Sequence, residues 1–428
     1  MPKRLAAFLF VILAAASAHA GISRYPYLQP TEDLSTSVAV MWQTDAKSGG
    51  AVKFGEKDTS EQSVDATWDG TSPRGKQRYW AVMKGLKPGT AYQYKVVSDG
   101  EESGVHSFTT SSDAEDFSFR ALLISDTHFN SGAQTPSWKA KFSNLLPELL
   151  AFKPQLTLHM GDFVVKVADD ASYEAGFRTA KELWASSLLA PVAGNHDTPG
   201  FNDKQLDIHL FAEEFRLPAN GPSPVDPAHA WMKTLFSSFN YGRVHFVTVG
   251  AGYLTFADAA VKDGRRWLQA DLDAAIAGGK VANIVARSHV PGPPDDTLLR
   301  ANAALYLAGH VHIWARLAPC LPGMPVSLGL ARETYANNWA GTVPIILPST
   351  VYVVKDIPKY PGAVVAPVVG YAEMTVSRGG RRIEITAYAK DNPDLSGPRR
   401  QIDHVVIERS LLKADAAPDS AGPKKETP

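Results

Sequence analysis

The hydrophobic and polar positions of the chain follow one pattern up to about residue 112 and a different pattern beyond it. In the first part, apolar and polar residues alternate with a period of two, as in STSVAVMWQT, GAVKFGE and AYQYKVVSDG. Turn-rich stretches such as DGTSPRG separate these runs. Short alternating segments of this kind predict β-strands with one buried face. We therefore expect residues 22–112 to form an all-β domain.

One short segment indicates the architecture of this domain. In GLKPGTAYQY, a Leu and a Pro-Gly pair precede Tyr92 and Tyr94. The arrangement resembles the tyrosine corner of immunoglobulin- and fibronectin-like sandwiches, in which a tyrosine hydroxyl bonds back to the backbone. Trp42 is then expected in the core of the sandwich, and SSDAED has the composition of a linker to the next domain.

From Phe117 onward, short apolar runs alternate with amphipathic stretches. The apolar runs predict buried strands in FRALLIS, PQLTLHM, LLAPVA, VHFVTV, VANIVARS and ALYLA. Apolar residues three and four apart predict helices in SWKAKFSNLLPELLAF, SYEAGFRTAKELWAS and DGRRWLQADLDAAIA. After Pro348, the runs TVYVV, GYAEMTVS, RRIEITAYA and DHVVIER follow without long helices, which predicts a second sheet that completes a sandwich. The fold predicted for residues 117–409 is an α/β/β/α layered domain.

The two ends of the chain have compositions of their own. Residues 1–20 combine Lys3 and Arg4, an apolar run from Leu5 to Ala16, and the small-x-small triplet Ala18-His19-Ala20. This combination predicts a cleaved signal peptide and a periplasmic or secreted protein. The alternative is an uncleaved anchor, but the apolar run is short for a bilayer span, so we expect no stable span after cleavage. Residues 411–428 are charged and rich in Ala and Pro, which predicts a disordered tail.

The overall charge and the single cysteine exclude some classes of function. The chain has 43 Lys and Arg against 44 Asp and Glu. This balance argues against a nucleic-acid coat and against a polybasic membrane patch. Cys320 is the only cysteine, so no intramolecular disulfide can form, and its loop-like setting APCLPG indicates an incidental thiol rather than a nucleophile.

Polar residues follow five of the predicted strands directly. They are Asp126 and His128, Asp162, the group Asn195, His196 and Asp197, His289, and the pair His310 and His312. Because the carboxyl ends of strands in layered α/β domains share one edge, we expect these five loops to converge.

The residue types in these loops point to metal ions. Imidazole nitrogens and carboxylate oxygens bind Zn, Mn and Fe. There are more ligands than one ion needs, so we predict two ions, with Asp162 as the carboxylate that bridges them. Two such ions polarise a phosphoryl oxygen and turn a bridging water into hydroxide. This is the chemistry of a phosphoester hydrolase, and it accounts for the lack of a Ser or Cys nucleophile motif.

The ordered set of motifs resembles that of the calcineurin-like metallophosphoesterases. Their pattern of D-x-H, G-D, G-N-H-[DE], a lone His and G-H-x-H is present here in order, from Asp126 to His312. The wider layout is similar to the purple acid phosphatase branch, in which a fibronectin-like domain precedes the catalytic one. The segments SSFNYGRVHFVTV, WLQADL, GHVHIWAR and GYAEMTVS also look like its landmarks, so the resemblance covers roughly residues 25–408.

The resemblance implies a role for each residue. Asp126, His128, Asp162 and His312 would hold the first metal ion, and Asn195, His289 and His310 would complete the second site around the bridging Asp162. His196 would be no ligand: it would face the phosphate and stabilise the transition state or protonate the leaving oxygen.

Two positions depart from the purple enzymes. His128 stands where they have Gly, and Val165 stands where they have the tyrosine ligand that gives the colour. We therefore predict that the protein is not purple. A neutral imidazole in place of a phenolate favours divalent Mn or Zn, and the identity of the two ions stays open among Mn, Zn and Fe.

Plainer structural roles compete with some of these assignments. The strand-end residues can serve as helix caps or turn formers, and a lone histidine such as His289 is often structural. Asp197 either orients an imidazole or stabilises its turn, and Arg316 either contacts phosphate or forms a surface salt bridge. His159 and His245 are expected in the core. Residues 198–241 form either a lid or a plain surface excursion.

The predicted function is a binuclear metallophosphoesterase that acts on a small phosphoester, most simply an acid phosphatase-like phosphomonoesterase. A phosphodiesterase or a nucleotidase of the same superfamily is the alternative among enzymes. A non-catalytic extracytoplasmic binding protein with a relic metal site is the alternative of another class. The oligomeric state is left open.

Overall fold

The computed structural model describes residues 21–130, 136–165, 170–198, 208–224, 230–250, 259–324, 331–335, 341–353, 362–410 and 412. The predicted signal peptide lies outside these residues, and so does the predicted disordered tail apart from Leu412. Within the described part, no helix is both long enough and apolar enough to span a membrane.

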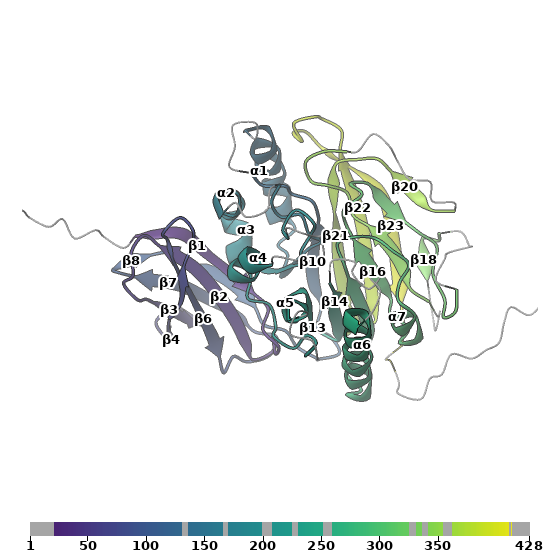
Figure 1. The fold of residues 1–428 in the computed structure, drawn as a ribbon, viewed down its shortest axis with the longest axis horizontal. Coiled ribbons are helices and arrows are strands. Elements are labelled where there is room, and N and C mark those ends of the chain that lie inside the picture. Colours follow the sequence, from purple (N-terminus) through teal and green to yellow (C-terminus); the bar gives the residue numbers. More distant parts are fainter. Residues whose placement is uncertain are drawn as a thin grey trace, which may run out of the picture.

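The N-terminal domain is a sandwich of two antiparallel sheets, as the alternating pattern predicts (Figure 1). One sheet has the order β1 (Ile22–Gln29), β2 (Ser37–Thr44), β6 (Gln77–Lys84) and β5 (Thr67–Thr71). The other has β4 (Gln62–Asp65), β3 (Ala51–Gly55), β7 (Ala91–Ser98) and β8 (Glu101–Glu102), with β9 (His106–Thr109) paired to β7. Trp42 is buried in the core, and the Lys87 N–H donates to the Tyr92 hydroxyl at 2.9 Å, which closes the tyrosine corner.

Two seven-stranded sheets form the second domain. The first has the order β12 (Leu188–Pro191), β11 (Leu156–His159), β10 (Phe119–Ile124), β21 (Gly370–Ser377), β22 (Arg382–Lys390), β23 (Arg399–Glu408) and β18 (Thr334–Tyr335). The second has β13 (Phe236–Tyr241), β14 (Val244–Val249), β15 (Asn283–Arg287), β16 (Leu305–Ala308), β19 (Val343–Ile346), β17 (Trp314–Arg316) and β20 (Val364–Ala366).

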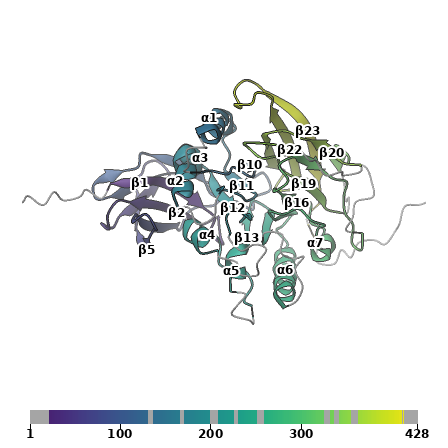
Figure 2. The ribbon, with the colours of Figure 1, turned by 45° about the horizontal axis from the view of Figure 1, so that its top comes forward.

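The side chains of the strands divide between an inner and an outer layer of core. Leu123 and Leu158 of the first sheet share the inner cluster with Leu305 and Ile345 of the second. On the outer faces, the helices α1 (Pro136–Ala151), α2 (Asp170–Thr179) and α3 (Lys181–Ser186) cover the first sheet, and α6 (Ala259–Ala277) and α7 (Asp296–Arg300) cover the second. Figure 2 shows α1 to α3 beside the N-terminal sandwich. The predicted α/β/β/α layering is confirmed.

The C-terminal strands do not build the second sheet, and that part of the expectation is wrong. β21 pairs antiparallel with β10, so β21, β22 and β23 extend the first sheet. The second sheet instead uses strands from residues 236–346, and β20 is its only described strand that lies after Pro348. Residues 350–353 of the apolar run TVYVV are not a strand either. Val351 is buried without strand pairing, which explains why the run looks strand-like in sequence.

A buried ion cluster joins the two domains. Arg24 of β1 lies against the acidic side chains of Asp170 and Glu174 in α2 and of Glu214 in α4 (His209–Glu214). Its Nε donates to Glu174 at 2.9 Å, and a second nitrogen bonds the fully buried Glu214. Among the described residues, α2 and α4 are the helices that next follow the loops carrying Asp162 and His196. The N-terminal domain is thus anchored to the segments that leave the predicted site.

Candidate metal centre

The structure brings the five predicted loops together at the carboxyl ends of parallel strands from both sheets. β10, β11 and β12 run parallel, and the loops that follow them carry Asp126 with His128, Asp162, and Asn195 with His196. In the second sheet, β15 and β16 also run parallel and are followed by His289 and by His310 with His312. The site therefore lies at the carboxyl-end edge of both sheets and takes residues from each of them.

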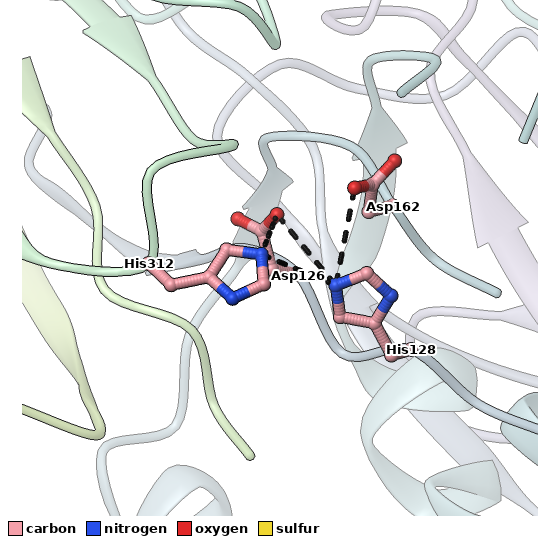
Figure 3. A group of neighbouring side chains, drawn as sticks. All are labelled: Asp126, His128, Asp162 and His312. Atoms are coloured by element: carbon pink, nitrogen blue, oxygen red, sulfur yellow. Dashed lines mark hydrogen bonds and ion pairs between the residues drawn. The ribbon is translucent and has the colours of Figure 1, made fainter. Parts of the chain in front are cut away.

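Four of these side chains form the first group (Figure 3). One ligand atom from each of Asp126, His128, Asp162 and His312 lies within 4.8 Å of all the others. His312 Nε2 is 3.0 Å from Asp126 Oδ1 and 3.3 Å from His128 Nε2. His128 Nε2 is 3.9 Å from a carboxylate oxygen of Asp126 and of Asp162.

Asp162 belongs to a second group as well, with His289 and His310. His289 Nε2 lies 3.2 Å from Asp162 Oδ2 and 3.0 Å from Asn195 Oδ1. The same amide oxygen is 2.9 Å from His310 Nδ1. Asp162 is therefore shared by the two groups, and the Asn195 amide oxygen lies against both imidazoles of the second group.

The backbone of these loops adopts a rarely used conformation. Ten described residues other than glycine have positive φ, and half of them are predicted ligands: Asp126 (52°), His128 (47°), Asp162 (54°), His310 (68°) and His312 (59°). Each such residue costs on the order of 1–3 kcal/mol, and strain of this kind concentrates at functional sites. The clustering supports a site built for function, independently of the sequence motif.

Two glycines make room for the close approach of these loops. A Cβ at Gly194 would lie 2.1 Å from Asp162 Oδ1 and 2.2 Å from the Asp162 backbone nitrogen. Gly161 has a φ of +92°, and a Cβ there would meet the His289 ring at 2.4 Å. No larger residue fits at either position without moving a predicted ligand.

The donor set fits a pair of cations. Asp126 Oδ1 is buried, and no well-aligned hydrogen bond to it is recorded in the described part of the chain, although His312 Nε2 lies 3.0 Å away. Its other oxygen is occupied by the Ser125 hydroxyl and by the His310 N–H. Two imidazole nitrogens that face each other at 3.3 Å have at most one proton to share. A cation between Asp126 Oδ1, His128 Nε2 and His312 Nε2 would bind a lone pair of each atom. The hydrogen bonds among these atoms alone do not use all of these lone pairs.

The charges of the side chains agree with this fit. Burial lowers the pKa of His128 to about 4 and also lowers the pKa of His310, so both imidazoles are neutral at neutral pH. Burial opposes the ionisation of Asp126 and Asp162, but the neighbouring imidazoles outweigh it and lower the pKa of both carboxyls. Burial also disfavours a charged His289, yet the Asp162 carboxylate raises its pKa to about 9. Without a metal, His289 holds the proton that a cation would displace.

Hydrogen bonds to the far side of the rings fix their orientation. His289 Nδ1 bonds the Met160 carbonyl at 2.6 Å, which leaves Nε2 free to act as a ligand. His196 Nδ1 bonds the Val165 carbonyl at 2.6 Å in the same way. The His196 ring lies 4.9 Å from the His128 ring, edge to face, and the His196 N–H donates to Asp162 at 2.8 Å. His196 therefore lies beside the ligands, with its Nε2 free of any bond recorded in the described structure.

Asp197 stabilises its turn and does not orient an imidazole, which was the other role considered for it. Its carboxylate accepts the N–H groups of Phe163, Val164 and Gly194 at 3.2, 3.1 and 2.9 Å, and none of its recorded partners is an imidazole. Burial and the nearby Asp162 charge raise the pKa of Asp197 to about 7. Asp197 thus ties the Asp162 loop to the Asn195 loop.

Arg316 has neither of the two roles considered for it, a phosphate contact or a surface salt bridge. It is 1% exposed, and its guanidinium binds the Asp403 carboxylate in a bidentate pair at 2.7 and 2.8 Å. A surface salt bridge is wrong for a side chain that is buried to this extent, and a phosphate contact is wrong because Asp403 occupies the fork. His159 and His245 are buried as expected. Cys320 is buried as well, and burial raises its thiol pKa to about 11.

Sequence reasoning missed two aromatic residues at the site. The Tyr352 hydroxyl is 3.4 Å from His128 Nε2, and the ring of Trp138 stacks on the Tyr352 ring. Tyr352 falls in the run that looked like a strand, and Trp138 looked like part of an ordinary amphipathic helix. Neither residue carries a local signal of its own, because only the tertiary fold brings them to His128.

Comparison with known proteins identifies both domains. Residues 24–110 match the N-terminal domain of purple acid phosphatases, and residues 119–314 match the calcineurin-like phosphoesterases. A solved purple acid phosphatase from yellow lupin (Lupinus luteus) seeds is similar with a TM-score of 0.67 at 13% identity, over 90% of this chain and 75% of that one. The structure of PhoD is similar with a TM-score of 0.63 at 11% identity, over 92% of this chain and 94% of that one. At such identities, the two structures bear on the fold alone. No curated protein sequence matches the chain.

Proposed function

The chain carries a calcineurin-like phosphoesterase domain at residues 119–314, which makes it a phosphoester hydrolase, and a purple acid phosphatase N-terminal domain at residues 24–110. From this premise we propose that it is an acid phosphatase-like phosphomonoesterase with two metal ions. The observation that carries the proposal is the sharing of Asp162 between two groups of ligand atoms. Two metal sites that share one carboxylate suit the in-line displacement of a phosphoester.

Asp126, His128, Asp162 and His312 would hold one ion, and Asp162, Asn195, His289 and His310 the other. When bound, the ions would supply Lewis-acid polarisation of a phosphoryl oxygen and a water nucleophile of lowered pKa. The residues of this chain supply the positioning. Their orientation is set before substrate arrives by the hydrogen bonds behind the rings and by the rigid turns.

His196 would act on the phosphoester itself. Because Nδ1 donates to the Val165 carbonyl, the proton available for chemistry is at Nε2, when the ring is charged. From there His196 would stabilise the charge that develops on the phosphoryl oxygens or protonate the leaving oxygen. Its backbone N–H, bonded to Asp162, fixes the ring relative to the shared carboxylate.

The preference for monoesters rests on the match of residues 24–110 to the N-terminal domain of purple acid phosphatases, so the experiment includes diesters. Metal-stripped protein is reloaded with Mn, Zn or Fe, and its metal content is measured. Hydrolysis of p-nitrophenyl phosphate, bis(p-nitrophenyl) phosphate and 5′-nucleotides is then compared. Faster turnover of the monoester supports the proposal, whereas faster turnover of the diester or a requirement for a nucleotide replaces it with the corresponding alternative.

Two variants separate an enzyme from a binding protein with a relic site. Asp162→Ala and Asn195→Ala should each lower kcat/KM at least a hundredfold and lower the bound metal. Gly278→Ala is the control, since a Cβ there meets only ordinary contacts at 3.5 Å. A wild-type protein that holds no metal and hydrolyses none of these esters would favour the binding protein.

We also propose that the protein works outside the cytoplasm. The support is the composition of residues 1–20, which resembles a signal peptide. Cell fractionation of the full chain, compared with a chain that lacks residues 2–20, tests this. Equal cytoplasmic retention of both chains would contradict it.

A further inference from the structure

We propose that Tyr352 is a substrate-binding residue whose hydroxyl donates a hydrogen bond to an oxygen of the phosphoryl group. The proposal deepens the proposed function and rests on it, because it names a contact for the phosphate at the same site. It concerns a side chain that lies outside the five sequence motifs and comes from the loop after β19.

The hydroxyl of Tyr352 reaches the centre of the first ligand group. It lies 3.4 Å from His128 Nε2, the atom that also faces His312 Nε2 at 3.3 Å. The Tyr352 ring stands edge to face with the His312 ring at 4.3 Å and lies 5.3 Å from the His128 ring. The hydroxyl therefore meets the ligand group at the nitrogens that converge, and not at the backs of the rings.

A metal ion at this group would change the bonding of the phenol. The hydroxyl shares a hydrogen bond with His128 Nε2, and the same nitrogen faces Asp126, Asp162 and His312 and is therefore the atom of His128 that would bind a cation. A nitrogen whose lone pair binds a cation no longer accepts a hydrogen bond. No second acceptor for this hydroxyl is recorded among the described residues. The acceptors that a phosphoester brings to the site are its phosphoryl oxygens, and a hydroxyl donor to such a charged oxygen forms a strong hydrogen bond.

The surroundings hold Tyr352 in place for this contact. Its ring stacks on Trp138 of α1, with centroids 5.4 Å apart and planes 18° apart. The loop is tied down through Ser349, whose hydroxyl donates to the Asp126 carbonyl at 2.8 Å and accepts the Val351 N–H at 3.1 Å. Lys141 of α1 also donates to the Val351 carbonyl at 3.1 Å. The phenol is thus positioned by the backbone of a ligand loop and by a rigid aromatic neighbour, which a binding residue needs.

The variant Tyr352→Phe tests the proposal, because it removes the hydroxyl and keeps the ring that stacks on Trp138. The affinity of inorganic phosphate for the Mn-loaded protein is measured by calorimetry, together with the Mn content and with kcat and KM for p-nitrophenyl phosphate. We expect phosphate to bind about tenfold to a hundredfold more weakly, as the loss of one hydrogen bond to a charged group implies, with Mn content unchanged. Tyr25→Phe is the matched control, since Tyr25 lies exposed on the N-terminal domain and its Lys181 contact needs only the ring.

The other outcomes decide against the proposal. Phosphate affinity within twofold of the wild type would overturn it, and so would a loss of Mn from the variant, which would make Tyr352 a support for the metal group instead. A second variant, Trp138→Leu, should weaken phosphate binding by a smaller factor if the stack positions the phenol. A wild type that binds phosphate but hydrolyses no ester would overturn the proposed function alone, whereas a wild type that binds no phosphate would overturn the present proposal.

Discussion

Replacing Gly194 with alanine should disable the metal centre through a single methyl group. The new Cβ would lie 2.1 Å from Asp162 Oδ1, whereas real Cβ atoms essentially never come closer than 3.0 Å, so the atoms must separate by about 0.9 Å. The Asp162 backbone nitrogen at 2.2 Å blocks the simplest escape, because the main chain of that loop would have to move as well. Metal–ligand distances tolerate only about 0.2 Å, and a misplacement of about 1 Å in a catalytic group costs on the order of a hundredfold in rate. We therefore expect Gly194→Ala to lower kcat/KM about a hundredfold and to weaken metal binding at both groups, since both contain Asp162.

The assay compares three proteins after chelation and reloading with the same metal. Wild type, Gly194→Ala and Gly278→Ala are examined for ions bound per chain, for kcat and KM with p-nitrophenyl phosphate, and for the midpoint of thermal unfolding. Gly278→Ala should match the wild type in metal content and turnover, because its Cβ has ordinary contacts. If Gly194→Ala binds its metal as tightly as the wild type and turns over within threefold of it, the assignment of Asp162 as the shared ligand is refuted.

Three further substitutions test the supports of the site. Asp197→Asn keeps the shape but turns an amide NH2 toward backbone N–H donors, so it should destabilise the fold by about 1–3 kcal/mol in denaturant unfolding and weaken metal binding. Arg316→Met leaves the buried Asp403 without its cation and should cost about 3–5 kcal/mol, yet it should leave the KM for phosphoester within twofold if Arg316 has no substrate role. Burial raises the pKa of Glu214 from 4.5 to about 7 against the opposing charge of Arg24, so the folded protein holds a proton there that the unfolded chain releases. That contribution to stability is complete below pH 4.5 and is lost as the pH rises through 7; Glu214→Gln should flatten this part of the stability–pH profile, and an unchanged profile would show that Glu214 is ionised throughout.

The predictions that depend on local sequence agree with the structure. The ligand loops were found because each polar motif directly follows a short apolar run, and parallel strands bring such ends together whatever the rest of the fold does. The tyrosine corner of Tyr92 was likewise visible, since its partner Lys87 is only five residues away. Local spacing was enough in both cases because the chemistry and the turn lie in one segment.

The expectations that failed depend on partners far away in the sequence. β21 pairs with β10 across more than 200 residues, so no periodicity within residues 370–377 reveals which sheet it joins. Arg316 looked exposed because its partner Asp403 is 87 residues away. Tyr352 lay in an apolar run that is buried as a loop. A hydrophobic pattern predicts which residues are buried, but it does not identify the residues against which they pack.

The backbone of the ligand loops is strained, so contacts from the rest of the molecule must hold these loops in place. Five predicted ligands in left-handed conformation cost together about 5–15 kcal/mol, as much as the net stability of a typical domain. Such loops persist only where other contacts over-determine them. Asp197 joins two of the loops through three N–H bonds, and Ser349 bonds the Asp126 carbonyl behind a third. The N-terminal sandwich is a further support, because its Arg24 forms ion pairs with Glu174 of α2 and Glu214 of α4. The sandwich contributes none of the predicted ligands, but through Arg24 it binds two helices that follow the ligand loops in the chain.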